Sequence, residues 1–97
     1  MDRLEHLRVL VAVADSGGLA AAARRLGHSP PAVTRAVAQL EQRIGAQLLV
    51  RTTRHVRLTD AGERFVADAR RILAELDEAE ALAGGAFREP QGLLSIT

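Results

Sequence analysis

The feature that most constrains the fold is the stretch 19–45, which predicts two short helices separated by a tight turn. Residues 19–26 are rich in alanine, one of the strongest helix formers. Gly27 can adopt the left-handed backbone that often ends a helix. Ser29 can cap a second helix through its hydroxyl, and Pro30 suits the first helical position because its missing N–H is not needed there. This arrangement is typical of a helix-turn-helix motif.

The second helix of this pair has an apolar face and a polar face. Apolar spacings of four, three and four predict a buried face made of Val33, Val37, Leu40 and Ile44. At about 100° per residue, the opposite face carries Pro31, Arg35, Ala38, Gln39 and Gln42, with Thr34 on its flank. That face has no acid and suits a DNA major groove, where Arg reads guanine, Gln reads adenine and a Thr methyl contacts thymine. An ordinary solvated helix face has the same composition, so this pattern alone leaves both interpretations open.

A longer set of residues falls at a characteristic spacing. It comprises Leu19, Ala22, Ala23, Leu26, Ser29, Pro31, Ala32, Val33, Thr34, Leu40, Glu41, Ile44, Gly45, Leu48, Leu49 and Arg51, followed by Leu58-Thr59-x-Ala61-Gly62. Together these residues resemble the N-terminal domain of LysR-type transcriptional regulators over the whole chain. The resemblance implies a mainly α fold: a winged helix-turn-helix of three helices with a short β-hairpin wing, then a long linker helix.

Composition argues against catalysis and against a membrane protein. Ninety-seven residues with two aromatics make one domain with a modest core, and the absence of cysteine excludes disulfides and thiolate metal sites. The three histidines, His6, His28 and His55, lie in separate predicted elements without a carboxylate at ligand or triad spacing. We therefore expect no enzyme activity, metal or cofactor. No apolar run approaches a membrane span or a signal sequence, which favours a soluble cytoplasmic protein.

Charge is unevenly distributed along the chain. Residues 1–58 contain nine arginines and four acids, a net charge of +5, whereas residues 59–97 contain four arginines and eight acids, a net charge of −4. A basic first half is the electrostatic footprint of a protein that binds a polyanion. The acidic second half indicates a different role.

Residues 1–58 are expected to form the DNA-binding domain, with two elements besides the helix pair. A first helix over 2–14 is predicted from a stripe of Leu4, Leu7, Val11 and Ala14, widened by Leu10 and Val13. Short apolar segments around a polar tip predict a hairpin within 46–58, and the resemblance identifies it as the wing. Arg54 at its tip is expected to enter a minor groove, while Arg51 and Arg57 bind phosphates.

Residues 59–83 predict a long helix used for dimerisation. Thr59 is a good N-cap, and a heptad seam follows at Phe65, Ala69, Ile72, Leu76, Ala79 and Ala83. About 24 residues at 1.5 Å each give roughly 36 Å, more than a small domain can cover. A terminal helix packed on its own domain is the alternative. The resemblance implies antiparallel pairing with the helix of a second chain.

Residues 84–97 predict a hinge followed by the opening of a β-strand. The resemblance implies that this strand leads into an effector-binding domain that the sequence does not contain. The chain is therefore expected to be a DNA-binding fragment, with a naturally short protein as the alternative. A small-molecule inducer is expected to act only through that absent domain, and a tetramer of the full-length protein stays open.

Two copies joined by the long helix are expected to bind an inverted repeat whose half-sites are about 34 Å apart, or a small multiple of that distance. The residues expected at DNA are Arg24, Arg25, Ser29, Pro30, Pro31, Thr34, Arg35, Ala38, Gln39, Arg51, Arg54 and Arg57. Pro30 stands where the LysR family commonly has glutamine, and Ala36 and Ala38 where polar or basic residues are frequent. Base readout is therefore expected to depend on Thr34, Arg35, Gln39 and DNA shape.

Two other interpretations remain open at this point. One is a winged-helix module that binds another protein through its wing or its heptad seam. The other is a related DNA-binding domain, such as that of the molybdate-responsive regulators, which shares the helix-turn-helix pattern.

Overall fold

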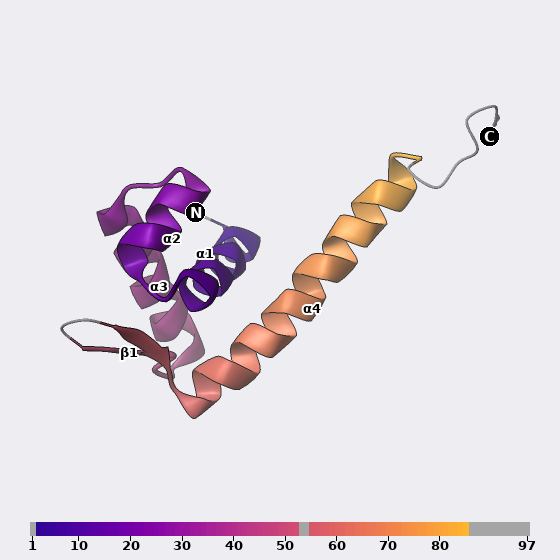
Figure 1. Ribbon diagram of the computed structural model, residues 1–97. Coiled ribbons are helices and arrows are strands. Elements are labelled where there is room, and N and C mark those ends of the chain that lie inside the picture. The colour runs from indigo at the N-terminus through magenta and orange to yellow at the C-terminus, as the bar shows by residue number, and fades with distance from the viewer. Residues whose placement is uncertain (1, 53–54, 86–97) are drawn as a thin grey trace.

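Four helices and one antiparallel hairpin account for the computed structural model, which describes residues 2–52 and 55–85. The elements are α1 (Arg3–Ser16), α2 (Leu19–Leu26), α3 (Pro30–Ile44), β1 (Leu49–Arg51), β2 (Val56–Leu58) and α4 (Asp60–Ala83). Figure 1 shows α1, α2 and α3 gathered into one body, with the hairpin at its edge and α4 projecting from it as a long rod. The predicted mainly α, winged fold is confirmed.

Local capping chemistry sets the helix ends. Ser29 caps α3 by accepting a hydrogen bond from the N–H of Ala32 at 3.2 Å, and Gly27 ends α2 with a φ of 75°. Both boundaries of the helix-turn-helix are as predicted. The first helix differs slightly, because Asp2 lies outside it as the N-cap, accepting from the N–H of Glu5 at 2.7 Å, and the helix continues to Ser16.

The buried face of α1 is not the predicted stripe. Val9, Leu10 and Val13 are fully buried, whereas the leading stripe residues Leu4, Leu7, Val11 and Ala14 are exposed or only half-buried. The reason is that α1 is the central helix and packs against α2, α3 and α4. A helix with three neighbours has no single apolar stripe to read from the sequence.

Two corrections also apply to α3. Val33, Val37 and Leu40 are buried as predicted, but Ile44 is 41% exposed because it lies in the last turn, at the edge of the body. Ala36, which the resemblance to the LysR family placed at a position of the reading face, is buried in the core instead. It follows Val33 by three residues and therefore shares its face.

The hairpin is joined to α4 by a close backbone contact. Thr59 caps α4 by accepting from the N–H of Gly62 at 2.9 Å, and its own N–H donates to the carbonyl of Leu48 at 3.0 Å. A Cβ on residue 62 would lie 2.1 Å from that same carbonyl oxygen. In the Leu-Thr-x-Ala-Gly sequence, Thr59 thus caps α4, and glycine at position 62 is the only residue type that lets the helix backbone lie so close to the carbonyl of Leu48.

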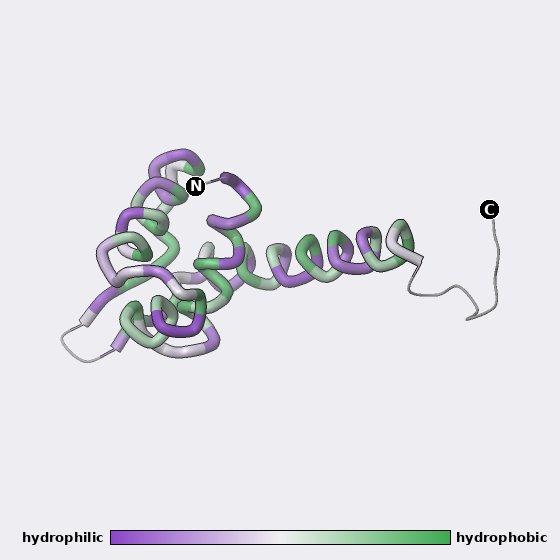
Figure 2. The backbone as a smooth tube through the Cα atoms, turned by 90° about the horizontal axis from the view of Figure 1, so that it is seen from above, coloured by the Kyte–Doolittle hydropathy of each residue, from purple (hydrophilic) through white to green (hydrophobic). Residues whose placement is uncertain are grey.

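Only the first half of α4 packs on the body. Gly62, Val66 and Ala69 are buried there, and Arg70 binds Asp15 of α1 through two hydrogen bonds of 2.6 and 3.3 Å. Beyond this pair the helix extends away, which gives the molecule its length of 55 Å against a width of 25 Å. Figure 2 shows hydrophobic and hydrophilic residues alternating along this projecting part. No helix among the described residues is long and apolar enough to cross a membrane.

Candidate nucleic-acid interface

The outer face of α3 is open to solvent. Pro31, Arg35, Ala38 and Gln39 are exposed, and Thr34 is half-buried at the edge of this face. The core face of the helix is held by α1 and α2. The helix therefore presents a fixed, acid-free surface of polar, apolar and cationic groups.

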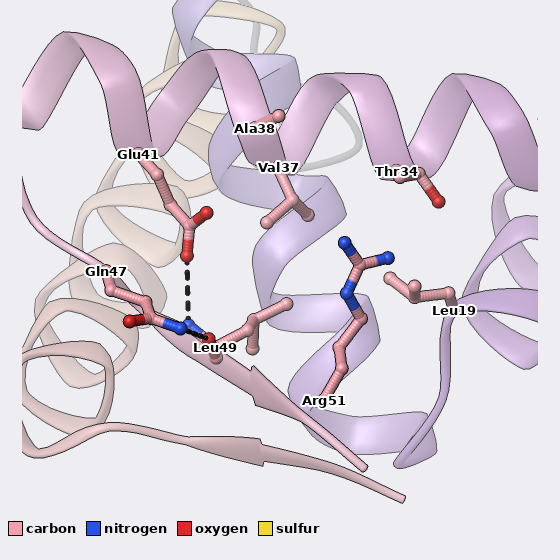
Figure 3. A pocket seen from close by; sticks show the side chains of 8 residues that line it. All are labelled: Leu19, Thr34, Val37, Ala38, Glu41, Gln47, Leu49 and Arg51. Carbon is pink, nitrogen blue, oxygen red and sulfur yellow. Dashed lines mark hydrogen bonds between the residues drawn. The ribbon is translucent and has the colours of Figure 1, made fainter. Parts of the chain in front are cut away.

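A groove of about 280 Å³ separates α3 from β1, and we call it the wing groove (Figure 3). Leu19, Val37 and Leu49 form its apolar floor. Figure 3 shows the guanidinium of Arg51 projecting from β1 across the groove, towards Thr34 and Leu19. A cation and a hydroxyl thus stand at the same rim, the chemistry that binds a phosphate.

Glu41 fastens the hairpin to α3. One of its carboxylate oxygens accepts hydrogen bonds from the backbone N–H groups of Leu48 and Leu49, at 2.7 and 3.1 Å. Gln47 adds a bond from its side-chain amide to the carbonyl of Leu49 at 2.9 Å. In the sequence Glu41 counts only among the residues at the family spacing, and this anchoring function was missed. A single acid on an otherwise acid-free helix was the available signal.

The hairpin does not gather its arginines on one face. Leu49 pairs with Leu58, Val50 with Arg57, and Arg51 with Val56. Since side chains alternate along a strand, Arg51 shares the face of Leu49, whereas Arg57 shares the opposite face with Val50. Of the two hairpin arginines that the structure describes, Arg51 borders the wing groove and Arg57 does not. Arg54 lies outside the described residues.

The remaining predicted DNA contacts surround the start of α3. Arg24 and Arg25 are exposed in the last turn of α2, and Ser29 and Pro30 are exposed at the first turn of α3. The positive end of the α3 dipole favours a phosphate there, although Pro30 and Pro31 have no N–H to donate and the N–H of Ala32 is bonded to Ser29. These residues therefore extend the cationic surface along the edge of the helix-turn-helix.

Side-chain hydrogen bonds from α1 support the helix-turn-helix from behind, and sequence reasoning missed them. The guanidinium of Arg43 donates a hydrogen bond to Nδ1 of His6, the one buried polar residue among those described. Burial lowers the pKa of His6, and the nearby charge of Arg43 lowers it further. His28, in the turn before α3, bonds the carboxylate of Glu5 at 3.0 Å.

The ion pair at the root of α4 has a similar role. The hydrogen bond from Arg70 holds the pKa of the Asp15 carboxyl below its usual value and raises the pKa of the guanidinium. No group of three or more His, Cys, Asp or Glu side chains in residues 2–52 and 55–85 is arranged to hold a metal.

Comparison with known proteins agrees with this geometry. The family model described as "Bacterial regulatory helix-turn-helix protein, lysR family" matches residues 4–63. The chain belongs to the LysR family. This family consists of transcription regulators and not of enzymes, and the match decides against the molybdate-responsive alternative.

Individual relatives cover nearly all of this chain. It is 46% identical to the transcriptional regulator YnfL of Escherichia coli over 93 residues, which are 96% of this chain and 31% of YnfL. It is 44% identical to PtxR of Pseudomonas aeruginosa over 94 residues, which are 97% of this chain and 30% of PtxR. The chain thus spans about a third of the length of these regulators.

Solved structures share the fold. The crystal structure of the CbnR_DBD–DNA complex matches with a TM-score of 0.83 and 40% identity, over 90% of this chain and all of that chain. The BenM_DBD/catB site 1 DNA complex matches with a TM-score of 0.84 and 31% identity, over 92% of this chain and 99% of that chain. Both are DNA complexes of domains similar to this one.

Proposed function

We propose that this LysR-family domain binds double-stranded DNA sequence-specifically, as a dimer on an inverted-repeat operator. α3 enters the major groove, and the β1–β2 hairpin is the wing that approaches the minor groove. The observation that carries the proposal is the exposed, acid-free face of α3, with Arg51 beside it at the wing groove. The two related domains in complex with DNA support it.

The contacts divide into those that read bases and those that hold the backbone. Arg35 and Gln39 project from α3 where base edges would lie, and Arg can bind guanine with two hydrogen bonds. Arg51, Arg24 and Arg25 bind phosphates near the positive end of the α3 dipole. Thr34, expected from the sequence to read a base, lies at the rim beside Arg51 and joins this phosphate set. Binding strength then comes largely from phosphate contacts and falls steeply with salt.

The free part of α4 joins the two copies. Phe65 and Ala69 of the seam pack on their own body, while Ile72, Leu76, Ala79 and Ala83 continue the apolar face beyond it. Residues 1–58 then read DNA and residues 59–83 dimerise. In a longer protein, residues 84–97 lead towards an effector domain where an inducer acts. A regulator of this kind works in the cytoplasm, where bacterial DNA is.

Replacement of Arg35 tests base readout. Arg35→Ala is expected to weaken specific binding by about 1–3 kcal/mol and to relax base choice at one position. The measurement is a titration of a selected operator and of a random duplex at fixed salt. Arg71→Ala is the matched control, since it removes the same charge from α4, a helix that carries none of the expected DNA contacts. Equal losses on both duplexes would show that Arg35 contacts only phosphate.

A winged-helix module that binds protein remains the competing function. Its hydrophobic contacts would not respond to salt as phosphate contacts do. A chain that shifts neither operator nor random duplex at low salt would favour this alternative and contradict the proposal.

A further inference from the structure

His6 is buried, with 4% of its surface exposed, and it lies where α1 packs on α3. The guanidinium of Arg43, in the last turn of α3, donates a hydrogen bond to Nδ1 of its ring. A guanidinium can only donate, so this Nδ1 carries no proton, and the neutral ring carries its proton on Nε2. The link between the two helices therefore requires the neutral form of His6.

The buried ring is costly to the fold. Nε2 of His6 is buried without a hydrogen-bond partner in the part of the chain that the structure describes. A buried donor without an acceptor lowers stability, and an apolar side chain in its place would avoid this cost. Arg43 is exposed, so water can hydrate its guanidinium when the ring is absent. The contact of His6 with Arg43 therefore indicates a role other than stabilising the fold.

The ring also lies behind the reading face of α3. Gln39 and Arg43 are four residues apart and are thus neighbours on one ridge of the helix. Gln39 is exposed on the outer face, where we expect it to read a base, and its side chain is close enough to His6 to offer the ring a hydrogen bond. His6 thus connects α1 both with a base-reading residue and with the last turn of the reading helix.

We propose that His6 is a positioning residue for base readout: its neutral ring holds Arg43, and with it the end of α3, in place before DNA binds. The inference rests on the proposed function and extends it to a buried residue behind the reading face. A side chain that is already fixed need not be ordered on binding, which is a gain of roughly twofold to tenfold in affinity. The gain applies to the operator, where bases are read, and not to a random duplex, which is held by phosphate contacts.

His6→Leu is the first test, because leucine fills the buried site but cannot accept a hydrogen bond from Arg43. Operator binding is expected to weaken roughly twofold to tenfold, while binding to a random duplex stays nearly unchanged. The urea midpoint is expected to be no lower than that of wild type, since the unpaired Nε2 is gone. A loss of operator affinity without a loss of stability separates positioning from a purely structural role.

Arg43→Ala tests whether His6 acts through its partner. This variant is also expected to lose operator affinity, beyond the cost of the charge alone, which Arg71→Ala on α4 measures. The double variant His6→Leu/Arg43→Ala is expected to lose less than the sum of the two single losses, because one contact contributes to both. Losses that add fully would overturn the inference, since the two side chains would then act independently.

The pH profile of DNA binding is a second readout. A proton on Nδ1 removes the acceptor that Arg43 uses and sets a second positive charge beside the guanidinium. Burial, the charge of Arg43 and the charged amino terminus lower the pKa of His6, whereas Gln39 and Asp2 raise it. The preference for operator over random duplex is therefore expected to fall in wild type as the pH goes below the ordinary pKa of 6.5.

His6→Gln is the matched variant for this profile, because its amide oxygen can accept from Arg43 and does not titrate. We expect it to prefer the operator as wild type does at about pH 7.5 and to keep more of that preference at about pH 5.5. The other two histidines are present in both proteins. Equal profiles would contradict the inference.

The outcomes separate this inference from the proposed function. A folded His6→Leu chain that prefers the operator as strongly as wild type would overturn the inference and leave DNA binding intact. If circular dichroism shows that His6→Leu does not fold, the comparison of wild type with His6→Gln decides. A wild-type chain that binds a selected operator no better than a random duplex would overturn both the inference and the proposed function.

Discussion

α3 and the second half of α4 are both amphipathic helices, yet only α3 has its apolar face covered. Val33, Val37 and Leu40 of α3 are buried against the body, whereas Ile72 and Leu82 of α4 are exposed. The two helices have similar apolar spacings. Such a spacing predicts that one face of the helix is buried, but it does not identify the helix or the other chain that buries it. For α3 the cover is α1 and α2, and for the end of α4 we propose another chain.

The same two regions also differ in charge. The outer face of α3 has no acid and is flanked by arginines, whereas residues 72–83 carry four acids and no basic residue. A polyanion is therefore attracted to one end of the molecule and repelled from the other. The structure separates a region that can approach DNA from one suited to contact with protein.

The largest expected effect on stability comes from comparing the same change, Leu to Ala, in the packed body and at the end of α4. Leu10→Ala removes a fully buried side chain of α1 and should lower the free energy of unfolding by about 2–5 kcal/mol. Leu82→Ala removes a side chain that is 57% exposed and should change it by less than about 0.5 kcal/mol. Urea unfolding of both variants at low protein concentration measures the difference. Equal losses would mean that the end of α4 is packed within one chain.

Gly62→Ala tests the junction between the two regions. The new Cβ would meet the carbonyl oxygen of Leu48, a backbone atom that a rotamer change cannot move. We expect a loss of about 1–3 kcal/mol, as for other overpacked sites. Gly18→Ala is the control, because nothing lies within 4 Å of a Cβ there. An unchanged urea midpoint in Gly62→Ala would show that the junction is looser than the structure indicates.

The helix-turn-helix could be predicted to the residue because its boundaries depend on local chemistry. Gly27, Ser29 and Pro30 act on their own neighbours. As expected, α2 ends just before Gly27, and α3 begins at Pro30, just after Ser29. The covered side of α1 could not be predicted in this way, because three distant elements determine it. The same holds for Glu41 and His6, whose partners are seven and 37 residues away.

The wing shows where more could have been drawn from the sequence. The two-residue alternation of strands already implies that Arg51 and Arg57 lie on different faces once the register is known. The register itself depends on the pairing of Leu49 with Leu58, which the sequence leaves open. The proposed phosphate contact of Arg51 therefore gains support from the structure that Arg57 does not have.

Glu41→Ala tests how firmly the wing is fixed to α3. The substitution leaves the buried N–H groups of Leu48 and Leu49 without their acceptor, which should lower the free energy of unfolding by about 1–3 kcal/mol. Gln42→Ala, on the exposed next position, should have little effect. Amide hydrogen exchange at Leu48 and Leu49 gives a local readout, and protection that matches wild type would exclude this anchoring role.

The smallest expected effect is the pH dependence that His6 contributes to the α3 region. Its pKa is lowered in the folded chain by burial and by Arg43, so the folded state binds this proton less readily than the unfolded state does. The contribution of neutral His6 to the free energy of unfolding should therefore be complete above the ordinary pKa of 6.5. It should decrease as the pH falls below that value. His6→Gln removes the titration, so its urea midpoint should fall less than that of wild type between about pH 7.5 and 5.5. His28 and Glu5 are present in both proteins, so the comparison isolates the change at His6. Parallel profiles would mean that His6 takes up its proton in the folded chain as readily as in the unfolded one, which would contradict the lowered pKa.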